Sequence, residues 1–170
     1  MASLASALGL RATSSSTLFV PNNAPVFLGF HFLFAYGILS SRTLKQYYGI
    51  DHNVSPREDL AKYGEAAVRS GKITARQLGM LRRNESAHAN AVENYALLVA
   101  AMCCATFARV DPRYVNRAGF VYTAARMTYA LAYILIDHPK LSQIRGITWW
   151  TGNLSCLWLF WKAWAKLNEV

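Results

Sequence analysis

The chain contains a long run of apolar residues, 26–39, interrupted by His31, and three further apolar stretches follow it. Counted over residues 18–41, the first stretch is long enough to cross the roughly 30 Å of hydrocarbon in a bilayer at about 1.5 Å per residue of helix. The other three cover residues 87–107, 118–136 and 144–165. Only helices and closed barrels satisfy their backbone inside lipid, and runs of this length favour helices. The pattern predicts an all-α membrane protein with four transmembrane helices.

A long polar segment, residues 42–86, separates the first two predicted spans. Ser55 followed by Pro56 indicates the start of a short helix, because Ser is a favoured N-cap and Pro suits the first turn. A second short helix is expected from Thr74. Hydrophobic residues make up 54% of the chain, too few for a protein that is all membrane span, so polar loops of this kind are expected.

The first residues, 1–16, are small and weakly apolar, with Arg11 as their one charged residue. A signal peptide needs a basic start and a firmer apolar centre, so we expect a flexible or interfacial arm here. With 170 residues in total, the remainder, 17–170, is expected to form a single membrane domain.

The chain is strongly basic, with a formal net charge of +9. Nucleic-acid-binding proteins collect such charge on a surface with few long apolar runs, whereas here it lies between the runs, so a nucleic-acid partner is not expected. Residues 42–86 with Lys140 and Arg145 carry eleven basic residues on one side of the predicted membrane, against six on the other. Cytosolic loops are richer in Lys and Arg, which places that side in the cytosol and both termini outside the cell or in the lumen.

The three cysteines, Cys103, Cys104 and Cys156, all fall inside apolar stretches. An adjacent pair plus a single residue is not a disulfide framework, and no Cys/His spacing indicates zinc. We expect buried free thiols that act as small apolar side chains, and no metal site.

Polar residues inside the second span form one stripe. Arg83, Ser86, Asn90 and Glu93 follow a helical spacing that places them on one face. A carboxylate two turns inside a span costs several kcal/mol unless it has a partner. Two interpretations remain open: an ion pair that holds the helices together, or a polar pocket in which Glu93 binds a ligand ammonium group.

The third span shows a similar stripe of Arg126, Tyr129 and Tyr133. Arg126 stands about midway in its apolar run and needs an anion, for which Glu93 and a ligand carboxylate are the candidates. The tyrosines alone are equally typical of interfacial anchors. Arg145, at the start of the fourth span, is either a flanking basic residue or a guanidinium that stabilises a thiolate or oxyanion.

These motifs resemble the MAPEG superfamily, the membrane-associated proteins of eicosanoid and glutathione metabolism. The resemblance rests on Arg83-x-x-x-Ala87-His88-x-Asn90-x-x-Glu93, on Arg126-x-x-Tyr129-x-x-x-Tyr133 and on Arg145, and it covers about residues 25–165. Members include microsomal glutathione transferases, leukotriene C synthase and microsomal prostaglandin E synthase.

The resemblance implies a left-handed four-helix bundle assembled as a homotrimer in the endoplasmic reticulum membrane. Glutathione would bind in a bent shape between neighbouring subunits, near the cytosolic face, and a lipophilic substrate would enter from the bilayer. Glu93 would hold the glutathione amino group, with Asn90 and His88 beside it. Arg42 matches the basic residue that ends the family's first span. Arg126, Tyr129 and Tyr133 would line the tripeptide, and Arg145 would stabilise its thiolate.

The sequence departs from the family pattern at two places. Ser86 stands where many members have Arg, so a contact to a glutathione carboxylate is missing unless Arg83, one turn back, replaces it. The connection 137–143 is longer than in the mammalian synthases, which makes Lys140 an alternative to Arg145.

The function that the resemblance implies is that of a glutathione-dependent transferase, peroxidase or isomerase acting on a lipophilic electrophile. Two alternatives stand beside it. One is a relative without catalysis that binds and presents a lipid, as the lipoxygenase-activating protein does; the other is a biosynthetic isomerase on the same fold that does not use glutathione. The sequence does not distinguish a transferase from a peroxidase or an isomerase, nor identify the lipophilic substrate.

Overall fold

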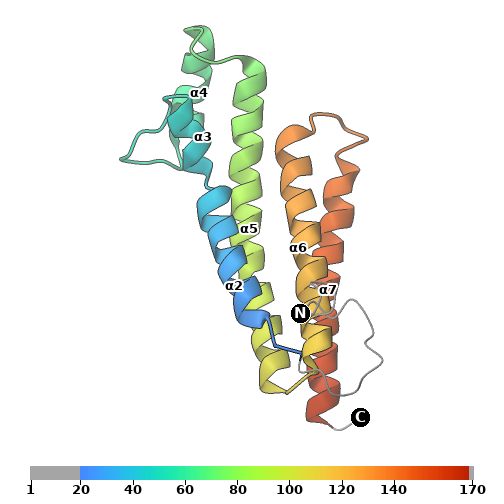
Figure 1. Ribbon diagram of the computed structural model, residues 1–170. Helices are drawn as coiled ribbons and strands as arrows, with labels where there is room; N and C mark the ends of the chain where they lie inside the picture. The colour runs from blue at the N-terminus through green and yellow to red at the C-terminus, as the bar shows by residue number, and fades with distance from the viewer. Residues whose placement is uncertain (1–19, 169–170) are drawn as a thin grey trace, which may run out of the picture.

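The computed structural model describes residues 20–168, and all the regular structure within that range is helical. The arm predicted for residues 1–16 lies outside the described residues. Three long helices, α5, α6 and α7, pack on one another, and α2 lies against α5 and α6 (Figure 1). The elements in chain order are α2 (Ala24–Leu33), η1 (Phe34–Ile38), α3 (Ser41–Tyr47), α4 (Asp59–Arg69), α5 (Ala75–Phe107), α6 (Pro112–Leu135) and α7 (Gln143–Leu167).

Two stretches, Ala24–Tyr47 and Ala75–Phe107, are long and apolar enough to cross a membrane. The second of these, α5, begins twelve residues before the predicted span 87–107, so the separate short helix expected from Thr74 is wrong. Thr74 is instead the N-cap of α5, where its side chain and that of Gln77 form a reciprocal capping box. Its 33 residues correspond to about 50 Å, more than a bilayer core requires, so α5 extends beyond the apolar region.

Helix α6 also begins earlier than the predicted span 118–136. Asp111 and Pro112 start the helix, with Asp111 as its N-cap. The Asp111 side chain accepts a hydrogen bond from the Arg113 N–H at 2.8 Å, and Pro112 occupies the first turn, where it has no helical N–H to lose. The predicted span 144–165 corresponds closely to α7.

The first predicted span, 18–41, is not one regular helix. Residues 20–23 are not helical, and α2 begins at Ala24. It continues into η1, a π-helical segment whose hydrogen bonds span five residues instead of four. The chain then turns at Leu39 and Ser40 into α3. Residues 18 and 19 lie outside the described range. The helix start expected at Ser55 is also wrong, because residues 55–58 form turns and α4 begins at Asp59.

A cap, which we define as residues 41–74, lies beside the amino-terminal part of α5 at the end of the molecule away from the α5–α6 connection (Figure 1). It has its own apolar core with α5, in which Leu60 and Ile73 meet Leu78 and Leu81. Lys45, only 1% exposed, reaches across to Glu85 of α5 at 2.8 Å. The cap is therefore attached to α5 by apolar packing and by a half-buried ion pair.

The larger core lies between α2, α5, α6 and α7. Leu98, Met102, Val115 and Leu159 are fully buried in it. Gly119 lets α2 approach α6, because a Cβ there would stand 2.4 Å from the ring of Phe27. The prediction of buried cysteines holds for Cys156, but Cys103 and Cys104 are exposed on the outer face of α5.

Candidate functional site

A cleft lies between η1, α3, the loop before α4 and α5. It consists of two adjoining hollows of about 510 and 490 Å³, within the range of small-molecule sites. Arg42 lines the first hollow and Glu93 the second. Charges of both signs therefore face one cleft. The residues that line both hollows are Tyr36, Ser41, Arg57 and His88.

His88 is positioned by the widened turn of η1. The Leu39 N–H bonds to the Phe34 oxygen at 2.9 Å, five residues back, which leaves the Ala35 oxygen without its usual helical donor. His88 Nδ1 lies 3.0 Å from that oxygen. A carbonyl only accepts, so Nδ1 carries the proton and donates, and Nε2 of the neutral ring is left as an acceptor.

Arg42 is held by the loop that follows α3. Its Nε and Nη2 donate to the two oxygens of Asp51 at 3.0 and 2.7 Å, and Nη2 also donates to Asn53. The guanidinium hydrogen bonds hold the pKa of the Asp51 carboxyl below its usual value. Arg42 therefore lines the cleft, but its charge is already largely neutralised by Asp51.

Arg57 is the cleft residue that the sequence analysis missed. It is exposed, lines both hollows, and pairs with no carboxylate in the described part of the chain. Sequence position offered only a weak signal, because residues 55–58 resembled an ordinary helix start. Its relevance comes from the fold of the cap, which brings the loop before α4 over His88.

Arg126 is buried, with 2% of its surface exposed, and it contacts the backbone of α5. Its Nη2 donates to the Asn90 oxygen at 3.0 Å, and its guanidinium lies 4.5 Å from the centre of the Tyr129 ring. Of the two anions that the sequence left open for Arg126, Glu93 forms no ion pair with it in the described part of the chain. Glu93 is exposed on α5, one turn beyond Asn90, and it interacts electrostatically with Tyr129 of α6 without pairing with Arg126. Arg126 Nη1 has no hydrogen-bond partner among the described residues.

The predicted tyrosines and Arg145 continue this arrangement. The rings of Tyr129 and Tyr133 lie 5.4 Å apart, and the Arg145 guanidinium lies 4.4 Å from the centre of Tyr133. Arg145 Nη2 donates to the Ile136 oxygen at 2.6 Å, while its buried Nε has no partner in residues 20–168. Lys140, the alternative, is exposed in the loop before α7. We call Arg126, Tyr129, Tyr133 and Arg145 the stacked row.

Arg83 does not reach the cleft. Its Nε donates to the Ile134 oxygen at 3.2 Å and its Nη1 pairs with Asp137 at 3.1 Å, so it ties α5 to the end of α6. Ser86 donates its hydroxyl to the Arg82 oxygen within α5. The expected replacement of the missing Arg by Arg83 therefore finds no geometric basis in the single chain.

The candidate residues fall into two groups that line different parts of the described chain, although α2 and η1 also contact α6. The cleft group, Arg42, Arg57, His88 and Glu93, faces η1 and the cap. The stacked row lies on α6 and α7. Asn90 stands between them, with its side chain bonded to the Ser86 oxygen and its own main-chain oxygen bonded to Arg126. Within one chain, the residues predicted to form a single pocket do not share one cavity.

Comparison with known proteins agrees with the resemblance seen in the motifs. The family model of the MAPEG family matches residues 24–165, nearly the whole described chain. No curated protein and no solved structure matches the sequence.

Proposed function

This chain belongs to the MAPEG family of helical membrane proteins, which includes glutathione transferases and isomerases, and on that basis we propose that it is a glutathione-dependent membrane enzyme. The observation that carries the proposal is the pair of buried guanidinium nitrogens without a hydrogen-bond partner in the described chain, Nη1 of the buried Arg126 and Nε of the partly exposed Arg145. Buried donors without partners cost free energy, so such atoms indicate a missing anionic ligand. The glutathione thiol would be added to a lipophilic electrophile by a transferase, or used and regenerated by an isomerase. In a peroxidase, two glutathione thiols would be oxidised to a disulfide while a lipid hydroperoxide is reduced to an alcohol and water.

The membrane arrangement proposed here has four spans, formed by α2 with η1, α5, α6 and α7. Large apolar side chains are exposed along α6 and α7, which soluble proteins rarely present in such number. The basic cap would then lie in the cytosol, with the cleft at its membrane boundary, in an endoplasmic reticulum protein assembled as a homotrimer. The exposed apolar residues include Phe120, Met127, Leu131, Ile147, Leu154 and Trp161.

The residues fit the charges of glutathione, which carries one ammonium group, two carboxylates and a thiol. Glu93, exposed and without an ion pair in the described chain, would hold the ammonium group. Arg57 would bind a carboxylate in place of the Arg that Ser86 replaces. Arg126 Nη1, the unpartnered nitrogen, would bind the other. The cleft group and the stacked row thus supply the complementary charges.

The two groups would meet across a subunit boundary. Because no residue of the stacked row lines the two hollows of the cleft in one chain, we infer that the cleft of one subunit faces the stacked row of its neighbour. This arrangement explains why Glu93 lies on the surface of a single chain instead of inside it. It also explains why both groups have unsatisfied charges when the chain is considered by itself.

Arg145 would activate the thiol. Glutathione supplies a thiol that is nucleophilic as the thiolate. A guanidinium beside the sulfur favours that charged form, and one pKa unit corresponds to about 1.4 kcal/mol. Arg145 is held for this role by Tyr133 and by the Ile136 oxygen, so its Nε is available at a fixed position. The stacked tyrosines would exclude water on one side of the sulfur.

The test of the proposal is a titration of the purified protein with glutathione, followed by thiolate absorbance and by thermal stability in detergent. Saturable stabilisation with a rise in thiolate absorbance is expected at neutral pH. If neither stabilisation nor a rise in thiolate absorbance appears at millimolar glutathione, the proposal is wrong. Comparing glutathione consumed with product formed then separates a transferase from an isomerase.

The subunit boundary has its own test. Two double variants are compared. One carries Arg57→Gln and Glu93→Gln in the cleft group, and the other carries Arg126→Met and Arg145→Ala in the stacked row. Each double variant should be inactive when it forms trimers by itself. In randomly mixed trimers about a quarter of the sites combine an intact cleft with an intact stacked row, so about a quarter of the activity should return. The matched control mixes chains that carry only Arg126→Met with chains that carry only Arg145→Ala. Both defects lie in the stacked row, so this mixture should restore no activity. Failure of the first mixture would place the site within one chain.

A second candidate function is lipid binding and presentation without catalysis. Ser86 favours this second function. Its hydroxyl donates to the Arg82 oxygen within α5, so a contact to a glutathione carboxylate that many family members have is absent. This candidate predicts no stabilisation by glutathione and saturable binding of a lipophilic ligand to the same protein. The titration described above separates the two.

A further inference from the structure

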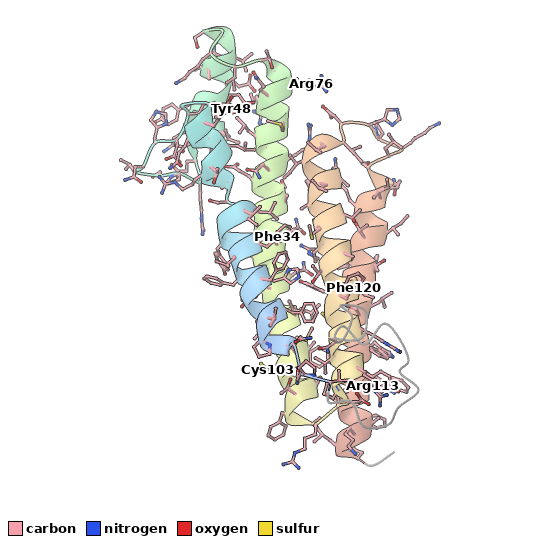
Figure 2. The ribbon with its side chains drawn as sticks, viewed as in Figure 1. Phe34, Tyr48, Arg76, Cys103, Arg113 and Phe120 are labelled. Carbon is pink, nitrogen blue, oxygen red and sulfur yellow. The ribbon has the colours of Figure 1, made fainter. Side chains whose placement is uncertain are left out.

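Two neighbouring hollows lie along the groove between α6 and α7, away from the cleft. The first, of about 450 Å³, is mainly apolar and is lined by Val121, Leu154 and Trp158. The second, of about 480 Å³, lies where α5 ends and is lined by Arg109, Lys162 and Lys166. Figure 2 shows this end of the molecule, with Arg113 labelled near the start of α6 and Cys103 near the end of α5.

The hollows follow one another along the same helix faces. Tyr114 of the basic hollow contacts Trp158 of the apolar hollow, with ring centres 5.5 Å apart. Lys162 Nζ lies 4.9 Å from the Tyr114 ring and 5.6 Å from the Trp158 ring, so it stands at their junction. From Thr151 to Lys166 the groove runs for about 22 Å of helix, on the order of one leaflet's hydrocarbon plus its headgroup region.

The basic hollow has an unbalanced positive charge. Its one carboxylate, Asp111, accepts from Arg113 Nη2 at 2.6 Å and Nε at 3.0 Å. These hydrogen bonds lower the pKa of Asp111, so the pair stays ionised and mutually neutral. Arg109, Lys162 and Lys166 have no carboxylate partner in residues 20–168. Three cations thus stand at the mouth of an apolar groove.

We infer that this groove binds an anionic phospholipid, with its phosphate among Arg109, Lys162 and Lys166 and one acyl chain along Val121 and Leu154. The inference rests on the four-span arrangement proposed above, but not on glutathione binding. Lysine and arginine at a membrane surface attract anionic headgroups, and tryptophan is common at headgroup depth. Free phosphate shares the headgroup chemistry, but it has no apolar part that could fill the apolar hollow next to the three cations.

Native mass spectrometry in nanodiscs of phosphatidylcholine with a minor fraction of phosphatidylglycerol measures the lipid retained by the protein. Lys162→Gln with Lys166→Gln should lower phosphatidylglycerol retention at least tenfold, since each surface cation contributes about fivefold. Arg76→Gln with Lys140→Gln, which removes two exposed cations at the other end of the molecule, is the matched control and should change nothing. Leu154→Trp, which fills the apolar hollow without altering charge, should lower retention severalfold.

Arg109→Gly keeps the test independent of folding. Arg109 has a φ of 56°, in the left-handed region that glycine adopts without strain, so this variant loses a cation but should keep its stability. Its phosphatidylglycerol retention should fall severalfold. Three outcomes overturn the inference: equal retention of phosphatidylcholine and phosphatidylglycerol, displacement of the lipid by millimolar inorganic phosphate, or a change in subunit number in the Lys162 and Lys166 variant. The last would show that a second copy covers the groove. None of these readouts depends on glutathione, so the proposed function fails or stands separately.

Discussion

Nη2 of Arg126 lies 3.0 Å from the main-chain oxygen of Asn90, so the buried guanidinium on α6 is held by the backbone of α5 and not by a carboxylate. A buried charge with only neutral partners is costly in a single chain. The same geometry leaves Nη1 available, and the exposed carboxylate of Glu93 lies one turn away along α5. This relationship favours a site that is completed by an anionic ligand.

Arg126→Met separates the role of Arg126 in binding from its role in the fold. Methionine fills a similar volume without a charge, so the stability of the protein without ligand should change by less than about 1.5 kcal/mol, or rise. The stabilisation by saturating glutathione, about 2.7 kcal/mol at one hundred times the dissociation constant, should disappear. Thermal unfolding in detergent with and without glutathione measures both. A variant that still gains the full stabilisation would remove Arg126 from the site.

Arg57→Gln tests the replacement for Ser86. Losing a charge-assisted hydrogen bond to a carboxylate should raise the dissociation constant of glutathione about tenfold, equivalent to 1.4 kcal/mol, and Arg57→Lys should recover part of it. Arg69→Gln removes another exposed cation of the cap and is the matched control. Calorimetric titration measures the three constants. Equal weakening by Arg57→Gln and Arg69→Gln would indicate a general effect of charge and not a contact.

The helices were predictable from the sequence, but their starts were not. Apolar runs show where a helix is buried in lipid, and they say nothing of the polar turns that extend it. Thr74 begins α5 through a capping box with Gln77, and Asp111 begins α6 by accepting a hydrogen bond from the Arg113 N–H. Both are local hydrogen-bond effects that resemble ordinary loop chemistry in the sequence.

The candidate site was predictable in its residue types but not in its pairings. Helical spacing correctly placed Arg126 beside Tyr129, because both lie on one helix. Helical spacing could not decide whether Arg126 pairs with Glu93, since the rotation of α5 against α6 is set by tertiary packing. Arg57 could not be found by spacing at all, because only the folding of the cap brings it to His88.

Arg145→Ala tests thiol activation. Glutathione should still bind, since the carboxylate and ammonium contacts remain, but the pKa of the bound thiol should rise by about one unit or more, which lowers activity at neutral pH about tenfold. Lys140→Ala, with the same change of charge in the neighbouring loop, should have no effect. Thiolate absorbance as a function of pH measures the shift. If the Lys140 variant shifts the pKa and the Arg145 variant does not, their roles are reversed.

Gly119→Ala tests the close approach of α2 and α6. The new methyl group would stand 2.4–2.7 Å from three ring atoms of Phe27, so the helices must move apart or the ring must turn. Overpacking of this kind costs about 1–3 kcal/mol, seen as a lower unfolding temperature in detergent. Gly29→Ala, on α2 with no atom within 4 Å of its new Cβ, is the matched control and should be neutral or stabilising. Phe27→Leu should restore part of the stability in the Gly119→Ala background, because it removes the ring that the methyl group meets. A Gly119→Ala protein as stable as the wild type would mean that α2 is not held against α6 at this point.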